Sequence, residues 1–260
     1  MSPRPCTGSS PRRRTRASLA HRCTRFGAAL WHRLPAGEVL DPQHQHRRER
    51  PVGILRIPLC QQVGKAGRVR VRMFTAWVDE SGSDMRRDPG TYMLSAALVE
   101  NGKEEGARAA MQALLLPGQK KLHWRDDASR HALIVEAIAA LGVEHFVVVH
   151  CAPDIDIRPE RQRRLCLGRL VPELAELGVT RVIAESRGRA DDRRDAQAVE
   201  HLRQSRRLSG PFHIDHARGP FDPLLWVPDA CCGVITRHRC GDSTHYEKLS
   251  TQITMCEVES

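Results

Sequence analysis

Three acidic residues stand where short apolar segments end or begin. Asp79 closes the run FTAWVD, Glu185 closes VTRVIAE, and Asp229 follows LLWVP at the start of a helix-like run. If folding brings these carboxylates together, their charges repel one another strongly unless a cation neutralises them. A ligand set made only of oxygen suits magnesium or manganese better than zinc. The three residues therefore predict metal-assisted hydrolysis of phosphodiester bonds.

Each carboxylate also has an ordinary structural explanation. Asp79 could cap the turn that follows it. Glu185 could form a surface ion pair with Arg187 or Arg181, worth about 0.5 kcal/mol. Asp229 could complement the dipole of its helix, worth ~0.3–1 kcal/mol. The sequence leaves these alternatives open, because it does not show whether the three side chains meet.

Strand and helix periodicity sharpens the choice of residues. Asp79 and Glu80 are adjacent, so on a regular strand they point to opposite faces, and only one can face the site. We favour Asp79, which shares its face with Trp77. Gly233 lies one helical turn after Asp229, and this small residue leaves room for a close neighbour.

Hydrophobic periodicity predicts an α/β domain in which five strands alternate with helices. Pro172 lies inside one predicted helix and predicts a kink or a fresh helix start there. The predicted strands cover residues 74–79, 91–99, 145–149, 179–185 and 212–215, and the first two form a hairpin. The predicted helices cover residues 104–116, 127–141, 160–177, 193–208 and 228–238.

The charge of the chain is concentrated at its N-terminus. The 260 residues carry a formal charge of +10, but residues 1–72 hold 16 basic and 3 acidic residues, a net of +13. The remaining residues, 73–260, have a net charge of −3. The first segment is rich in Pro, Arg, Ser and His, so we expect it to be disordered. It could be a basic arm for nucleic acid, a targeting peptide, or an untranslated stretch if synthesis starts at Met73.

Cysteine content and hydropathy limit the class of protein. Nine cysteines without a repeated spacing disfavour a disulfide framework and favour a reducing cytoplasm. No apolar run approaches the ~20 residues that span a bilayer. A zinc site is a weaker alternative, since no CxxC pair occurs among the cysteines and histidines of the C-terminal region. That region holds Cys231, Cys232, His238, Cys240 and His245.

Arginines of the acidic body gather in two stretches, residues 158–169 and residues 187–207. If they flank the carboxylates, they could hold a phosphate backbone. The alternative is a solvated helix surface balanced by nearby acidic residues. The sequence supports both interpretations equally.

Four short motifs resemble a widespread bacterial family, the domain of unknown function numbered three thousand eight hundred. Its members open with a strand that ends in Asp-Glu-Ser-Gly and continue with a Lys-x-x-Trp-like segment. A strand ending in an acidic residue and a late helix with an Ala-Asp pair follow. The matches span about residues 75–240, and proline replaces the alanine of the last motif. The matching segments begin at Asp79, Lys121, Val182 and Pro228.

This family is similar to the ribonuclease H-like superfamily, which implies a mixed five-stranded sheet flanked by helices. The resemblance implies that Asp79, Glu185 and Asp229 are catalytic residues that bind two Mg²⁺ or Mn²⁺ ions and cleave DNA or RNA. Glu80 and Asp195 are candidates for a further ligand, and Lys121 or His123 for contact with the scissile phosphate. The alternative is a catalytically silent nucleic-acid-binding or complex-forming subunit of a mobile-element or defence system. The sequence leaves the oligomeric state undetermined.

Overall fold

The computed structural model describes residues 62–63, 69–70, 72–152 and 157–259, all within the compact unit formed by residues 51–260. The strands are β1 (Gln62–Val63), β2 (Val69–Arg70), β3 (Phe74–Gly82), β4 (Thr91–Glu100), β5 (Glu144–Cys151), β6 (Val179–Glu185), β7 (His213–Ala217) and β8 (Ile253–Val258). The α-helices are α1 (Glu104–Gln112), α2 (His131–Leu141), α3 (Pro159–Glu176), α4 (Arg189–Gln204), α5 (Trp226–Arg239) and α6 (Tyr246–Leu249).

Six strands form one mixed sheet in the order β7-β6-β3-β4-β5-β8. β3, β4 and β5 make an antiparallel meander, while β6 and β7 add in parallel on the other side of β3. β8 extends the sheet in parallel beyond β5. The predicted fold class, an α/β fold with a mixed sheet flanked by helices, is confirmed, although the sheet has six strands where five were predicted.

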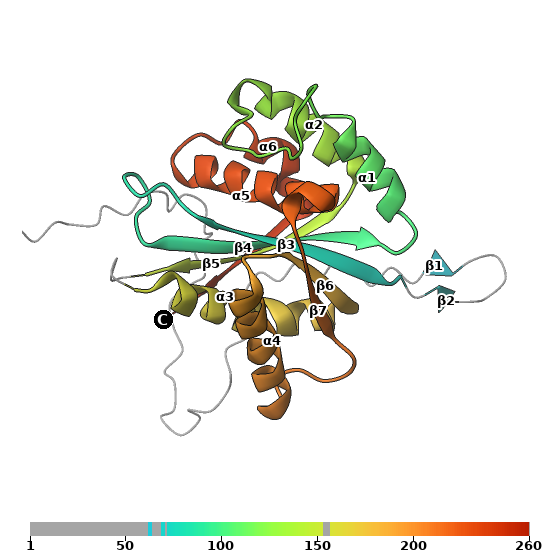
Figure 1. Ribbon diagram of the computed structural model, residues 1–260, viewed down its shortest axis with the longest axis vertical. Helices are drawn as coiled ribbons and strands as arrows, with labels where there is room; N and C mark the ends of the chain where they lie inside the picture. The colour runs from blue at the N-terminus through green and yellow to red at the C-terminus, as the bar shows by residue number, and fades with distance from the viewer. Residues whose placement is uncertain (1–61, 64–68, 71, 153–156, 260) are drawn as a thin grey trace, which may run out of the picture. The chain divides into compact units, whose positions relative to one another are not determined.

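Side-chain alternation along β3 divides the core into two layers. Trp77 packs on one face with residues of α1, α2 and α5, whereas Ala76 and Val78 pack on the other with residues of α3. Figure 1 shows α1, α2, α5 and α6 over one face of the sheet and α3 and α4 over the other. The strand β4 is buried on both faces from Thr91 to Val99. This explains its almost unbroken apolar sequence.

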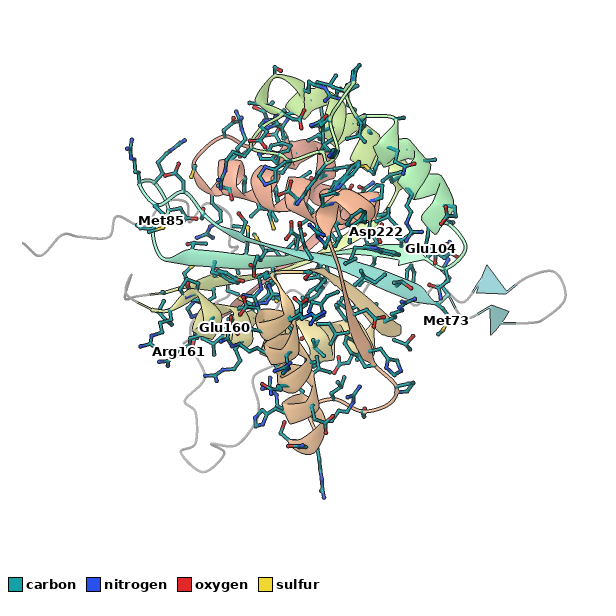
Figure 2. The ribbon with its side chains drawn as sticks, in the orientation of Figure 1. Met73, Met85, Glu104, Glu160, Arg161 and Asp222 are labelled. Carbon is teal, nitrogen blue, oxygen red and sulfur yellow. The ribbon has the colours of Figure 1, made fainter. Side chains whose placement is uncertain are left out.

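A buried polar contact anchors the α1 layer to β3. The indole Nε1 of Trp77 donates to Oδ2 of Asp222 at 2.8 Å, and Nε of Arg108 donates to Oδ1 of the same carboxylate at 3.1 Å. Asp222 is labelled beside α1 in Figure 2. Its carboxylate thus satisfies a buried indole and a guanidinium from two different elements.

All five predicted strands and all five predicted helices exist, with boundaries shifted by a few residues. The sixth strand of the sheet, β8, was not predicted. Its side chains are exposed or half-buried, as expected at a sheet edge, and carry no strong apolar pattern. No helix in the described ranges is long and apolar enough to cross a membrane.

Pro172 does not start a new helix, because α3 runs without interruption from Pro159 to Glu176. A proline has no N–H, so the carbonyl four residues earlier loses its helical partner. That carbonyl belongs to Gly168, and Nη2 of Arg207 donates to it at 2.7 Å. A side chain from outside the helix therefore replaces the missing hydrogen bond.

Within the segment predicted to be disordered, residues 1–72, the structure describes the antiparallel strands β1 and β2, of two residues each, and Arg72. The remainder of residues 1–71 lies outside the described residues, so its disorder and the proposed start at Met73 stay predictions.

Candidate functional site

Two neighbouring parallel strands carry Asp79 and Glu185 to the same place. The register pairs Trp77 with Ile183 and Val78 with Ala184. Asp79 and Glu185 are the next residues on the two strands. Both therefore project from the face on which Trp77 packs.

The helix α5 supplies the third carboxylate. It begins at Trp226 and places Asp229 in its first turn, while Ala230, Val234 and Ile235 are fully buried beneath it. The helix lies on the same side of the sheet as the Trp77 face (Figure 1). Three residues separated by up to 150 positions in the chain thus come close enough for Asp79 to interact electrostatically with both Glu185 and Asp229, at the C-terminal ends of β3 and β6.

The electrostatics of Asp79 reflect this convergence. Burial raises its pKa well above the ordinary value, and the negative charges of Glu185 and Asp229 raise it further. Burial also raises the pKa of Asp229, with a smaller increase from Glu185. Ionisation of both carboxylates therefore carries a cost, which comes mainly from burial.

One lysine partly balances the cluster. Nζ of Lys121 lies 2.7 Å from Oε1 and 2.8 Å from Oε2 of Glu185, so the ammonium binds both oxygens. Gly219 makes this ion pair possible. A Cβ at that position would lie 2.4 Å from Oε1 of Glu185 and 2.7 Å from Nζ of Lys121.

The segment that carries Lys121 crosses the start of α5. The backbone N–H of Trp124 donates to Oδ2 of Asp229 at 2.8 Å. Its indole occupies the space left by Gly233, where an added Cβ would lie 2.1 Å from the ring. The same ring stacks on His131 with centroids 3.5 Å apart. Trp124 is therefore the close neighbour that the glycine in α5 was predicted to admit.

His123 lies beside the same helix start. Its Nε2 is 3.8 Å from Oδ1 of Asp229, and its Nδ1 is 3.7 Å from Oδ2 of Asp126. The imidazole is half-buried, so it stands at the margin of the carboxylate cluster. Lys121 and His123, both predicted to contact substrate, are thus brought to this cluster.

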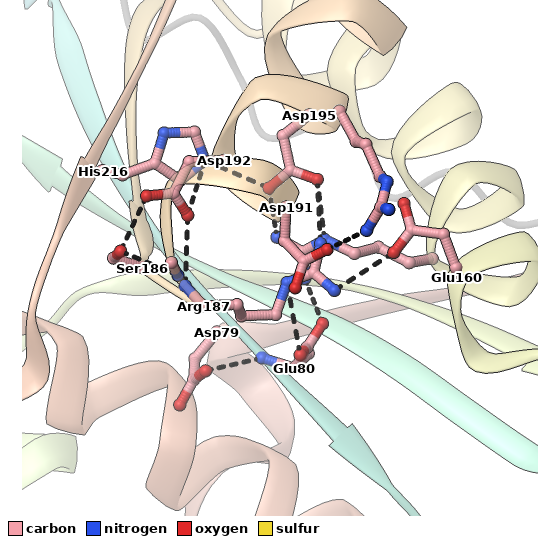
Figure 3. Close-up of polar contacts among 12 residues, drawn as sticks. Asp79, Glu80, Glu160, Ser186, Arg187, Asp191, Asp192, Asp195 and His216 are labelled. Carbon is pink, nitrogen blue, oxygen red and sulfur yellow. Dashed lines mark hydrogen bonds and ion pairs between the residues drawn. The ribbon is translucent and has the colours of Figure 1, made fainter.

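The two further candidates for metal ligands lie on the other face of the sheet, where arginines hold them. Glu80 and Asp195 belong to an ion-pair network that contains Arg163 and Arg187 and faces α3 and α4. Nε and Nη2 of Arg163 donate to Asp195 at 2.9 and 2.7 Å, and Nη1 pairs with Glu80. Figure 3 shows the Asp79 carboxylate pointing away from this network. Strand alternation is the reason, since Glu80 directly follows Asp79 on β3.

Further contacts extend the network. Nη2 of Arg187 donates to Asp195 at 3.3 Å and Nη1 to Glu160 at 3.2 Å (Figure 3). Nε2 of His216 lies 3.1 Å from Asp195. Burial by itself would raise the pKa of Asp195, but hydrogen bonds from Arg163 and His216 and the two guanidinium charges hold it well below the ordinary value. Asp195 is thus a structural anion.

The donor chemistry of the cluster on the Trp77 face fits a hard divalent cation. Asp79, Glu185 and Asp229 offer only carboxylate oxygens, and burial raises the pKa of Asp79 and Asp229, with a further increase from the neighbouring carboxylates. Among residues 72–152 and 157–259, however, no group of three or more His, Cys, Asp or Glu side chains is already arranged to hold a metal ion. The ammonium of Lys121 takes the cation position at Glu185. A metal ion therefore requires Lys121 to give way.

The cysteines and histidines considered for zinc have other surroundings. Cys231 and Cys232 are buried in a small apolar cluster with Met93. Nδ1 of His238 lies 2.8 Å from the Ser243 hydroxyl oxygen. Burial raises the pKa of Cys231 to about 12, so its thiol stays protonated at neutral pH.

Sequence reasoning missed several residues that shape the site. One indication of Trp124 came from the sequence, because this residue shares a motif with Lys121. Its hydrogen bond to Asp229, however, comes from the backbone N–H, which side-chain patterns do not predict. Gly219 begins a 3-10 helix of three residues, Gly219–Phe221, which is too short to show a periodic pattern, so nothing singled it out. Arg163 appeared only as one of many arginines in a helix.

Comparison with known proteins gives structural likenesses only. No family model matches the chain, and no curated protein matches it. Among solved structures, ribonuclease HII of Archaeoglobus fulgidus, determined in a complex with PCNA, is similar over 69% of this chain and 77% of its own, with 11% identity and a TM-score of 0.42. Ribonuclease H2 of Pyrococcus horikoshii OT3 is similar over the same shares, with 13% identity and a TM-score of 0.43.

Proposed function

We propose that this protein is a divalent-metal-dependent nuclease that hydrolyses phosphodiester bonds by a two-metal mechanism. The observation that supports it is the meeting of Asp79, Glu185 and Asp229 from β3, β6 and α5, with the pKa of Asp79 raised by burial and by the other two. Uncompensated carboxylates are costly, and sites that retain them often bind a cation or perform catalysis.

In this proposal the three carboxylates hold Mg²⁺ or Mn²⁺. The ions, when bound, polarise the phosphodiester and lower the pKa of an attacking water. Asp79 and Asp229 bind metal in their ionised form, so their raised pKa values make binding stronger as pH rises. Metal binding would release the protons that these groups carry.

The basic residues at the margin act on the substrate. Lys121 is held at Glu185 by two contacts of 2.7 and 2.8 Å. Once Glu185 binds metal, the ammonium is free to pair with a non-bridging phosphate oxygen. His123, beside Asp229, is placed to donate a hydrogen bond to the same phosphate.

Cleavage of labelled DNA and RNA oligonucleotides with Mn²⁺, Mg²⁺ or EDTA tests the proposal. Asp79→Asn and Asp229→Asn should abolish metal-dependent cleavage and weaken Mn²⁺ binding measured by calorimetry. Asp215→Asn, which changes an exposed carboxylate paired with Arg181, is the matched control and should retain activity. Full cleavage by either site variant would refute the assignment.

A second function is favoured by the Lys121–Glu185 ion pair, which neutralises one candidate ligand without any metal. The protein would then be a silent nucleic-acid-binding or complex-forming subunit. It would bind oligonucleotides with salt-dependent affinity and cleave none of them with any divalent ion, and the same assays separate the two functions.

A further inference from the structure

A groove of about 980 Å³ lies between α3 and α4, on the face of the sheet opposite the carboxylate cluster. Leu165, Leu202 and Val258 contribute apolar surface to it. Basic side chains stand on both of its walls. They are Arg158, Arg161, Arg164 and Arg169 from the α3 side and Arg194 and Arg207 from the α4 side.

The charge of the groove is strongly positive. Its lining contains these six arginines and only two carboxylates, Glu160 and Asp195. Both carboxylates already bind Arg187, so they do not neutralise the arginines of the walls. An excess of positive charge in a concave surface concentrates anions there.

Three arginines of the α3 wall are available to a ligand. Arg158, Arg161 and Arg164 are exposed and form no ion pair within the described part of the chain. Figure 2 shows Arg161 at the beginning of α3, extending away from the sheet. By contrast, Arg194 pairs with Asp191, and Arg169 lies 2.7 Å from Glu173.

The spacing of the arginines along α3 suits a polymer of anions. At ~1.5 Å per residue, the α3 arginines from 158 to 169 extend over about 16 Å, which is too long for a single phosphate. Arginine binds phosphate in a bidentate manner. A positive groove with apolar surface is also typical of sites that follow the backbone of single-stranded nucleic acid while its bases contact apolar side chains.

We propose that the α3–α4 groove binds the phosphodiester backbone of a single nucleic-acid strand. The proposal rests on the proposed function for the choice of nucleic acid as the polyanion. The structure also connects the groove to the candidate active site. Asp195 and Glu160 line the groove and accept from Arg187, which is two residues beyond Glu185. A strand in the groove would therefore lie against the network behind the tips of β3 and β6.

Fluorescence anisotropy with a labelled 12-nucleotide DNA or RNA strand tests this site. The full-length protein is titrated in EDTA, so that no metal-dependent cleavage occurs, at several NaCl concentrations. Arg161→Gln combined with Arg164→Gln should raise the Kd about tenfold. The slope of log Kd against log salt should fall by about 1.4, or ~0.7 for each lost phosphate contact.

The matched control is Arg86→Gln combined with Lys103→Gln, which removes the same charge from exposed positions outside the groove. All variants carry the same segment 1–72. Equal affinity of the groove and control variants would overturn the proposal. It would also be overturned if poly-glutamate displaced the oligonucleotide at equal charge concentration, because the groove would then suit an acidic polypeptide.

The outcomes of the two proposals are independent. If the groove variant binds like the wild type while Asp79→Asn has lost cleavage, the groove proposal fails and the nuclease proposal stands. If no variant ever cleaves but the groove variant loses affinity, the binding site stands and the nuclease proposal fails.

Discussion

Two adjacent residues of β3 face opposite electrostatic environments. Asp79 lies with Glu185 and Asp229 in a cluster of three carboxylates, beside which stands Lys121. The pKa of Asp79 is raised by burial and by the other two carboxylates. Glu80 points to a network where Arg163 and Arg187 bind it together with Asp195. The pKa of Asp195 there is held low. One strand thus separates an undercompensated anionic site from a compensated one.

The comparison distinguishes a candidate site from structural ion pairs. Both groups are partly or fully buried, so burial alone does not separate them. The balance of charge separates the two groups. The arginine network stabilises the ionised form of its carboxylates, whereas ionisation of Asp79 and Asp229 costs free energy that a bound cation would remove. Acidic residues with too few positive partners are therefore the better metal candidates.

The largest loss of stability should come from removing a guanidinium from the arginine network around Asp195. Arg163→Met leaves Asp195, of which only 1% is exposed, without its main partner. We expect a loss of about 3–5 kcal/mol in the free energy of unfolding, as for other buried ion pairs that lose one member. Urea denaturation measures it. Arg164→Met, an exposed neighbour, should change stability by less than about 0.5 kcal/mol. A similar small loss for both variants would show that the network is not structural.

The second prediction concerns the packing of Trp124 on α5, which supports the side of the sheet with the three carboxylates. Gly233→Ala places a Cβ 2.1 Å from the Trp124 ring, so the segment from Lys121 to Trp124 must shift. We expect a destabilisation of about 1–3 kcal/mol and a change in tryptophan fluorescence. Gly106→Ala in α1, where a Cβ meets nothing within 4 Å, should be neutral or stabilising by up to ~1 kcal/mol. Equal behaviour of the two variants would contradict the packing of Trp124 on α5.

Removing charge from the undercompensated side should stabilise the metal-free protein. The folded state raises the pKa of Asp79, so at neutral pH the ionised form opposes folding. This cost is absent below the unfolded pKa of about 3.9, grows as pH rises from there to the folded pKa, and stays constant above the folded pKa. Asp79→Asn should therefore raise the free energy of unfolding in EDTA by about 1 kcal/mol at pH 7, with a smaller difference in acid. Urea denaturation at several pH values measures the free energy of unfolding, with Asp215→Asn as the control. A destabilised Asp79→Asn variant would contradict the raised pKa of Asp79.

The smallest expected effect is on metal affinity and comes from removing the Lys121 ammonium, which pairs with Glu185. Lys121→Met removes the ammonium with which a metal ion competes at Glu185. Calorimetric titration with Mn²⁺ should show affinity raised about three- to tenfold, or ~0.6–1.4 kcal/mol. Lys120→Met, which changes the exposed adjacent lysine, should leave affinity unchanged. Weaker binding in the Lys121 variant would mean that the lysine supports the metal site instead of competing with it.

Local sequence patterns determined most of the elements of this fold. Apolar patterns predicted most of the strands β3 to β7 and the helices α2 and α3, helix-forming residues predicted α1, and strand alternation placed Asp79 and Glu80 on opposite faces. The glycine in α5 signalled a close neighbour, which is Trp124. The edge strand β8 lacked such a pattern, and the uninterrupted α3 depends on Arg207, a residue distant in sequence that binds the carbonyl of Gly168.

The amino-acid sequence by itself determined where chain segments become strands or helices and which residue types stand at their ends, because these follow from local periodicity. Only the tertiary structure decided which charges meet. It brought Lys121 to Glu185 and Arg163 to Asp195. It also gathered the arginines of α3 and α4 around one groove. Such pairings depend on the packing of elements far apart in the chain, and electrostatic interactions act through space between them.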